Sequence, residues 1–236
     1  SRDGSSLLYS GYREPSLFRH SRMFRAPLDG GPIERLTDAF GGLPREAENG
    51  DILFSRGYGY LNRPQYRGPG ARGIWRYTPG ENAFERLTEF NGNEFDPFQL
   101  PDGSVVFVSS RTGDNNVYRL TSTPNGDAIE QLTDFEPARG EQTIGHGVRN
   151  LAVSRDGSTA AFTVWDALYT LDLTDSNARA EHVSVTVLGD DAIPTVEAHD
   201  LKDEADEVAL HPSGEAVAIA ARGELFIRSV KEDRPA

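Results

Sequence analysis

The stretch from Asp96 to Asp134 has the clearest pattern of apolar and polar positions in the chain. It contains four short apolar segments bounded by turn residues: Phe98–Leu100, Val105–Ser109, Val117–Leu120 and Ile129–Leu132. Val105 to Val108 form a continuous β-branched and aromatic run, which is typical of a strand buried on both faces. Four strands joined by turns within about forty residues predict one antiparallel sheet, the size of a β-propeller blade.

The turns between these segments have a defined chemistry. Pro101–Gly103 fits a tight turn, because proline presets φ at the first corner and glycine accepts a positive φ. Thr112–Asp114 and Asn125–Asp127 carry turn residues of the same kind. We expect each of these segments to reverse the chain between neighbouring strands.

The same unit recurs along the chain. A glycine preceded by Asp, Asn or Ser occurs at intervals of roughly 50 residues, at Gly4, Gly50, Gly103, Gly157 and Gly214. Segments that end in Leu-Thr recur in register with these turns: Arg35–Thr37, Arg86–Thr88 and Gln131–Thr133. Several motifs in phase disfavour a meander of unrelated hairpins. They predict five repeated sheets, each of which must bury its faces against its neighbours.

The repeats also predict how the chain is organised. The first unit lacks a strand before its turn at Gly4, and the last unit stops before its closing strand. We therefore expect the chain to begin and end inside a blade. The polar, acidic segment 188–205 breaks the spacing and has no strand pattern, so we interpret it as a connector.

Composition excludes several classes of protein. With 37% hydrophobic and 26% charged residues, the 236-residue chain is typical of a globular protein, and no apolar run predicts a membrane span. The net charge of -13 argues against a nucleic-acid partner, since phosphate binding needs a basic face. The absence of cysteine excludes disulfides, thiolate catalysis and cysteine-ligated zinc.

No catalytic or metal-binding motif is visible. The chain contains no Gly-x-Ser-x-Gly, P-loop or His-Glu-x-x-His sequence. Its histidines are far apart and fall at turns or strand starts: His20, His146, His182, His199 and His211. The acidic stretches at Asp190–Asp191 and Asp203–Glu207 lack a spaced calcium loop with a bidentate glutamate, so we interpret them as linker. We predict no catalytic residue, no metal and no cofactor.

One loop is a candidate binding site. The segment Gly57–Gly73 interrupts the second unit and combines a glycine-rich backbone with tyrosines and arginines: Tyr58, Tyr60, Arg63, Tyr66, Arg67 and Arg72. An arginine can pair with a peptide carboxylate through two parallel hydrogen bonds. The candidate substrate-binding residues are Arg63, Arg67, Arg72 and Tyr66. The alternative is that the arginines brace neighbouring blades against Asp or Glu while the tyrosines cover a sheet edge.

The repeat resembles that of the Tol-type and tricorn-type β-propellers. It reads Pro-Asp-Gly, an aliphatic run with Phe-Val-Ser, Arg-x-Gly, a Val-Tyr strand and a final Gln/Arg-Leu-Thr. Two stretches resemble tricorn proteases in particular. Tyr66–Trp75 is similar to a Tyr-Arg-Gly-Gly-Thr-x-Gly-x-Ile/Leu-Trp insertion, with Pro69 in place of a glycine, and Ala221–Phe226 is similar to the strand that opens a second propeller.

This resemblance implies that residues 1–187 are the later blades of a six-bladed propeller and that residues 206–236 begin a seven-bladed one. It implies a non-catalytic part of a cytoplasmic, homo-oligomeric serine peptidase, whose propellers give peptides access. The remaining propeller, PDZ-like and peptidase domains would belong to the same parent chain, and no position here matches the family's Ser-His-Ser-Glu machinery. The alternative is a stand-alone periplasmic Tol-type propeller that binds proteins as a scaffold. Neither interpretation involves nucleic acid or a membrane.

Overall fold

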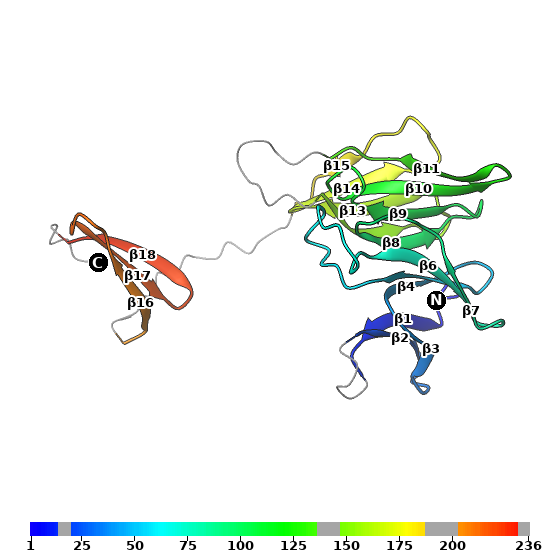
Figure 1. The fold of residues 1–236 in the computed structure, drawn as a ribbon, viewed down its shortest axis with the longest axis horizontal. Helices are drawn as coiled ribbons and strands as arrows, with labels where there is room; N and C mark the ends of the chain where they lie inside the picture. The colour runs from blue at the N-terminus through cyan, green and yellow to red at the C-terminus, as the bar shows by residue number, and fades with distance from the viewer. Residues whose placement is uncertain (14–19, 136–146, 187–202, 231–236) are drawn as a thin grey trace. The chain divides into compact units, whose positions relative to one another are not determined.

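The computed structural model describes residues 1–13, 20–135, 147–186 and 203–230, which form strands and turns without a helix (Figure 1). The chain divides into two compact units, Ser1–Val185 and Thr186–Ala236. Nothing in the described part of the chain forms a helix of the length and apolarity that a membrane span requires.

The first unit contains four antiparallel sheets, in each of which the strands pair in chain order. Sheet 1 has three strands: β1 (Ser6–Gly11), β2 (Arg22–Pro27) and β3 (Glu34–Phe40). Sheet 2 has four: β4 (Gly42–Glu46), β5 (Ile52–Arg56), β6 (Gly73–Thr78) and β7 (Ala83–Arg86). Sheet 3 has four: β8 (Glu94–Gln99), β9 (Val105–Ser109), β10 (Asn116–Thr123) and β11 (Gly126–Gln131). Sheet 4 has four: β12 (Val148–Val153), β13 (Thr159–Val164), β14 (Ala167–Asp172) and β15 (Glu181–Val183).

The second unit contains one further sheet among its described residues. Sheet 5 has three strands: β16 (Ala205–Leu210), β17 (Ala216–Ala221) and β18 (Glu224–Ser229). Most of the expected connector at 188–205 lies outside the described residues, and β16 already begins at Ala205.

The apolar cores lie between successive sheets. Sheets 1 and 2 enclose Met23, Ile52, Phe54 and Tyr77. Sheets 2 and 3 enclose Leu53, Ile74, Val105, Phe107, Tyr118 and Leu120. Sheets 3 and 4 enclose a larger cluster that includes Phe95, Val106, Val108, Leu151 and Phe162. The strand β9 therefore buries alternate side chains against sheet 2 and sheet 4, which confirms the interpretation of its continuous apolar run.

The first strands of neighbouring sheets adjoin, since β8 contacts both β4 and β12. Successive four-stranded sheets thus stack face to face with their first strands side by side, and the outermost strands β7 and β11 are exposed. This is the architecture of β-propeller blades, and it confirms the predicted all-β fold class.

A repeated turn explains the recurrence of Asp-Gly-Ser. In Asp3, Asp102 and Asp156, one carboxylate oxygen accepts the backbone N–H of the serine two residues on, at 2.9, 2.9 and 3.0 Å. The same oxygen accepts the hydroxyl of that serine. The intervening glycine has a φ of 76°, 85° and 75° respectively. The turn needs a short acceptor side chain and then a residue that tolerates positive φ, so this pair of residues recurs.

The Leu-Thr motif satisfies backbone groups beyond the last strand of a sheet. The hydroxyl of Thr88 accepts the N–H of Ile74 at 3.0 Å, and the hydroxyl of Thr133 accepts the N–H of Val117 at 2.9 Å. The N–H of the preceding leucine bonds to the carbonyl of the same residue, at 2.9 and 2.8 Å. These threonines are buried, so an unpaired N–H here would be costly. Each of these two motifs begins at the last residue of its strand, β7 or β11, and its threonine lies two residues beyond the strand end.

The strand β4 is an element that the apolar pattern did not predict. Its sequence, Gly-Leu-Pro-Arg-Glu, is mostly polar or small. The three inner strands β4, β8 and β12 share an irregular register and a non-glycine residue with positive φ, at Leu43 (57°), Asp96 (50°) and Asn150 (53°). Such a bulge interrupts the alternation of inward and outward side chains along the strand. The regular apolar alternation that marks a strand in the sequence is therefore broken in an inner strand.

The turn carboxylates should titrate at low pH. The pKa of Asp156 is lowered from 3.8 to about 2, first by the Ser154 hydroxyl and then by the amide and hydroxyl of Ser158. Because this pKa is depressed in the folded state, its stabilising effect is present above pH 3.8 and is lost as the pH falls toward 2. An NMR titration of Asp156 should give a pKa about 2, and Ser154→Ala should raise it. A value near 3.8 in the folded protein would contradict the turn geometry.

The inner-strand residue Asp96 should oppose folding at neutral pH. Its carboxylate is only 6% exposed, and burial raises its pKa more than the Arg45 guanidinium at 3.9 Å and the N–H of Leu151 lower it. The ionised form is therefore unfavourable once the pH rises above 3.8. Asparagine keeps the acceptor and suits positive φ. We expect Asp96→Asn to raise Tm at neutral pH by roughly 2–4 °C.

That gain should shrink as the pH is lowered toward 3.8, because the wild-type carboxyl then becomes neutral as well. Thermal denaturation followed by circular dichroism at several pH values measures both effects. A lower Tm at neutral pH would mean that the pair with Arg45 outweighs the cost of burial.

Candidate functional site

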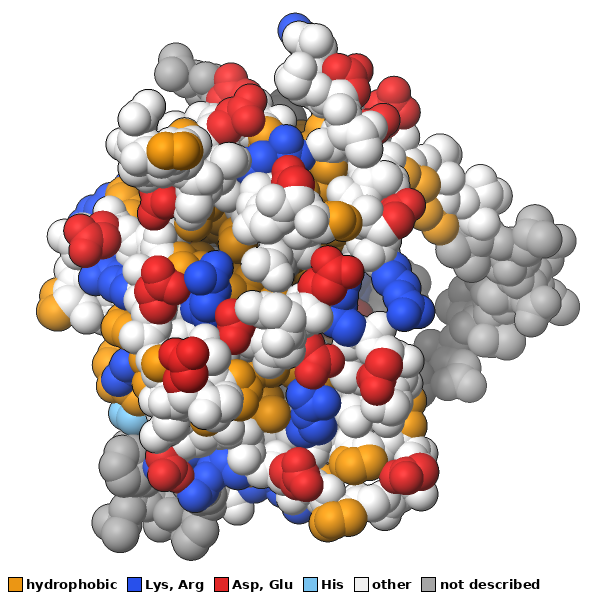
Figure 2. Space-filling model, turned by 90° about the vertical axis from the view of Figure 1, so that its right-hand side faces the viewer, with side chains coloured by type: hydrophobic (Ala, Val, Ile, Leu, Met, Phe, Trp, Pro, Cys, Tyr) orange, Lys and Arg blue, Asp and Glu red, His pale blue; other side chains and the backbone are white. Residues whose placement is uncertain are grey.

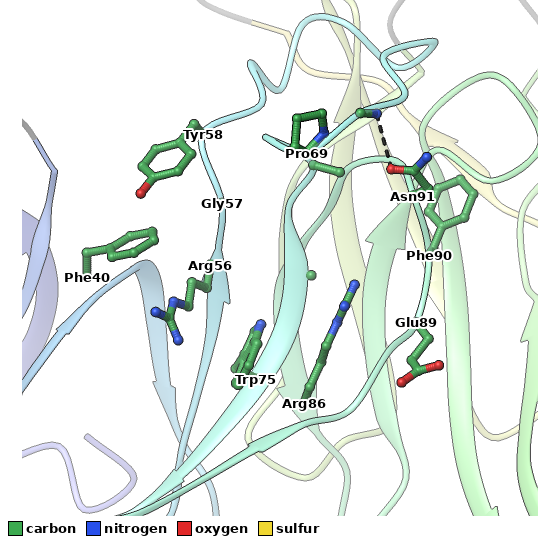
Figure 3. Close-up of a pocket in the computed structure, with 13 residues that line it drawn as sticks. Phe40, Arg56, Gly57, Tyr58, Pro69, Trp75, Arg86, Glu89, Phe90 and Asn91 are labelled. Atoms are coloured by element: carbon green, nitrogen blue, oxygen red, sulfur yellow. Dashed lines mark hydrogen bonds between the residues drawn. The ribbon is translucent and has the colours of Figure 1, made fainter.

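A pocket of about 580 Å³ lies where the loop Gly57–Gly73 passes over the ends of the strands of sheet 2 (Figure 3). We call it the loop pocket, and the side chains that define its character are Phe40, Arg56, Tyr58, Trp75, Arg86 and Glu89. Phe40 ends β3, Arg56 ends β5, and Tyr58 lies in the loop itself. The pocket is therefore built on a packed sheet and closed over by a loop.

Strand register brings three of these side chains to one face. Trp75 on β6 pairs with Arg86 on β7 and with Phe54 on β5. Residues directly opposite each other in an antiparallel pair share a face, and so do residues two apart on one strand. Arg56, two residues after Phe54, therefore lies on the same face as Trp75 and Arg86. Because Phe54 packs in the core between sheets 1 and 2, this face is the one turned toward sheet 1.

The cation of Arg56 is held between aromatic rings. Its guanidinium lies 4.6 Å from the ring centre of Phe40 and 5.1 Å from that of Trp75. Phe40 stacks in turn on Tyr58, with centroids 5.0 Å apart and planes inclined by 17°. Such cation–π contacts are worth about 0.5–1 kcal/mol each at exposed sites and fix the direction of the guanidinium.

The two arginines of the pocket have no anionic partner among the described residues. Neither Arg56 nor Arg86 forms a hydrogen bond or an ion pair there. Glu89 is the one carboxylate among the described residues that line the pocket, and Figure 3 shows its side chain turned away from the Arg86 guanidinium, which points up toward the loop. The arrangement can accept an anion without first breaking a salt bridge.

Of the residues proposed from sequence, Arg67 and Arg72 are engaged with backbone carbonyls. Arg67 donates to the carbonyls of Pro64 at 2.9 Å, of Tyr66 at 2.8 Å and of Ser110, just after β9, at 3.0 Å. Arg72 donates from Nε to a loop carbonyl at 2.6 Å, and burial lowers its pKa. These contacts hold the loop through carbonyls rather than through Asp or Glu.

The other two proposed residues also make contacts inside the loop. The Arg63 guanidinium lies 5.4 Å from the ring centre of Tyr60, and the Tyr66 hydroxyl accepts the N–H of Gly70 at 3.0 Å. The structure thus brings the four residues into one loop, but the pocket beside it presents Arg56 and Arg86 instead. A direct contact of Arg63, Arg67, Arg72 or Tyr66 with a peptide stays a prediction.

Asn93 is an anchor of the loop that sequence reasoning missed. Its fully buried amide donates to the carbonyls of Tyr60 at 3.0 Å and Arg63 at 3.2 Å, and accepts the N–H of Arg72 at 3.3 Å. A Cβ on Gly59 would collide with the same amide, which explains the glycine. No motif marks Asn93, because its partners are backbone groups some 30 positions away in the chain. Arg56 and Arg86 carried a weak signal, since each ends a strand of sheet 2.

The described histidines make local contacts. His20 packs against Tyr58, with ring centroids 4.4 Å apart, and His182 packs edge-on against Tyr169 at 5.5 Å. The ring of His211 bonds to the hydroxyl two residues on, at 2.8 Å. His146 and His199 lie outside the described residues. Within the described part of the chain, no three His, Asp or Glu side chains come together as a metal site would require.

The sheets and their stacking place this chain in the class of β-propeller proteins. No protein-family model and no curated protein matches the sequence. Among solved structures, TolB from Acinetobacter baumannii is similar over 97% of this chain and 50% of its own, with a TM-score of 0.57 and 20% identity. A putative TolB from Agrobacterium tumefaciens is similar over 76% of this chain and 61% of its own, with a TM-score of 0.55 and 20% identity.

The tricorn protease is similar over 97% of this chain and 26% of its own, with a TM-score of 0.49 and 16% identity. The chain spans about half the length of the TolB structure from Acinetobacter baumannii. At 20% identity, the likeness to the two TolB structures shows the fold alone, which is that of a β-propeller.

Asn93→Ala should loosen the loop. The substitution leaves two carbonyls and one N–H without their partner, so we expect a loss of about 1–3 kcal/mol in stability. Limited trypsin digestion should also cut faster after Arg67, which precedes Gly68 in the loop. The matched control is Asn91→Ala, which removes one exposed hydrogen bond, to the N–H of Gly68 at 3.1 Å. Equal cleavage rates in the wild type and in Asn93→Ala would contradict the role of Asn93 as anchor.

Proposed function

We propose that this chain is a non-catalytic β-propeller module that binds polypeptide segments. The observation that carries the proposal is the loop pocket on the end of a packed sheet, with aromatic walls and two arginines that have no carboxylate partner among the described residues. Aromatic and arginine side chains are those most enriched at sites that recognise polypeptides. A loop on a rigid sheet is also the usual place for binding residues.

The parent that we propose is a tricorn-like serine peptidase, in which this region controls the access of peptide substrates and products. The sequence stretches Tyr66–Trp75 and Ala221–Phe226 support this parent. In such a parent, residues 1–187 are the later blades of a six-bladed propeller and residues 206–236 begin a seven-bladed one. The partners are then the remaining propeller, PDZ-like and peptidase domains of the same chain, in a cytoplasmic homo-oligomer.

A stand-alone Tol-type propeller that binds proteins in the periplasm is the second candidate. The similarity of the fold to TolB over 97% of this chain favours it. The gene that encodes the chain separates the two. A PDZ-like module and a serine-peptidase domain downstream support the first candidate, whereas a signal peptide and a stop after the last blade support the second.

Peptide binding without cleavage is the expected behaviour of the 236-residue chain. Titration of short fluorescein-labelled peptides should raise their fluorescence anisotropy to saturation, and mass spectrometry should find them intact. Peptide turnover by the purified chain would overturn the non-catalytic assignment, and the absence of any binding would overturn the binding module.

We further propose that Arg67, with Arg63, Arg72 and Tyr66, supports peptide binding by holding the wall of the loop pocket. Arg67→Ala removes donors from three carbonyls, so it should lower kcat/KM for peptides in the parent peptidase without unfolding it. If Arg67→Ala lowers Tm but leaves kcat/KM unchanged, Arg67 only stabilises the contact between the loop and the neighbouring sheet.

A further inference from the structure

We propose that the loop pocket holds a carboxylate of a bound peptide between the guanidinium groups of Arg56 and Arg86, with an aromatic side chain of that peptide against the rings of Phe40, Tyr58 and Trp75. This inference rests on the proposed function of peptide binding. It assigns the site to two residues outside the set that the sequence indicated.

The first argument is that these two cations differ from the arginines of the first unit whose guanidinium groups are already paired. Arg25, Arg76 and Arg111 each pair with a glutamate, at 2.6, 3.0 and 2.6 Å. Arg67 and Arg72 donate to carbonyls. In a chain with a net charge of -13, carboxylates are abundant, and the described residues still leave Arg56 and Arg86 without one. On the face shown in Figure 2, acidic and basic side chains are interspersed.

The second argument is geometric. Arg56 and Arg86 lie on the same face of sheet 2 as Trp75, and both line the loop pocket. The Arg56 guanidinium borders the indole of Trp75. Gly73 adds no side chain there, and a Cβ at that position would lie 3.3 Å from Nε of Arg86, so the glycine gives the Arg86 guanidinium its place in the pocket. Arg56 is held between two rings before any ligand arrives, which lowers the entropy cost of binding.

The third argument concerns the kind of anion. A guanidinium presents a planar fork of donors that matches a carboxylate. The protein's net negative charge and Glu89 at the rim disfavour a ligand with many charges, such as a nucleic acid. Three aromatic rings beside the cations favour an apolar group next to the anion. A carboxylate next to an aromatic residue of a peptide meets both requirements, and it can come from the chain terminus or from an Asp or Glu side chain.

Binding of matched peptides tests the proposal. The probe is a short fluorescein-labelled peptide that ends in phenylalanine with a free carboxylate, compared with its C-terminal amide and with an amide that carries aspartate next to phenylalanine. We expect the free acid to bind about tenfold more tightly than the plain amide, which corresponds to one charge-assisted pair. If the aspartate amide binds as tightly as the free acid, the site accepts side-chain carboxylates. If the aspartate amide binds as weakly as the plain amide, the site is specific for the terminal carboxylate.

Variants locate the effect. Arg86→Gln, at an exposed position, and Arg56→Gln should each bring the free acid to within about twofold of the amide. Arg179→Gln removes the same charge at an exposed position outside the pocket and should leave the preference unchanged. If acid and amide bind the wild type equally, the carboxylate site is wrong while the peptide-binding module stands. If none of the peptides binds, the proposed function itself fails.

Discussion

The fold depends on burial between sheets, because a single four-stranded sheet has no interior of its own. The strand β9 shows the constraint most clearly, since all five of its residues are buried. Val105 and Phe107 enter the core shared with sheet 2, while Val106 and Val108 enter the core shared with sheet 4. The middle strands must therefore be apolar on both faces, whereas the outer strands β7 and β11 are free to be polar. Each of sheets 1 to 4 therefore depends on its neighbours in the stack for burial.

Polar contacts cluster at one end of the strands of sheets 2 and 3. Glu94 is fully buried at the start of β8, where its carboxylate accepts the Ser109 hydroxyl at 3.0 Å and pairs with Arg111 at 2.6 Å. Its own carbonyl accepts the hydroxyl of Ser55 from sheet 2 at 2.9 Å. A buried carboxylate is tolerated when it is paired and hydrogen-bonded, and it then favours a single arrangement of the groups around it. These bonds lie at the end of the sheets that carries the loop pocket.

The loop pocket follows from the same architecture. Arg67 reaches from the loop to the carbonyl of Ser110, just after β9, and Asn93 ties the loop to the segment between sheets 2 and 3. The hydrogen bonds of these side chains are thus used to hold the loop. Arg56 and Arg86, at the ends of β5 and β7, have no such partner among the described residues, and they lie on the face of sheet 2 that packs on sheet 1. The two guanidinium groups therefore come from a packed sheet, and the loop forms one wall of the pocket around them.

The sequence by itself determined the repeat, the all-β class and the positions of the middle strands, because each rests on local chemistry. Asp-Gly turns, Leu-Thr segments and β-branched runs act within a few residues and can be recognised without coordinates. The inner strand β4 escaped prediction because a bulge at Leu43 breaks its alternation. Only the tertiary structure decided which arginines are free, since the partners of Arg67 and Arg72 are backbone carbonyls that approach on folding. A carbonyl belongs to every residue and leaves no mark in a sequence, so the sequence alone does not show which arginines a carbonyl engages.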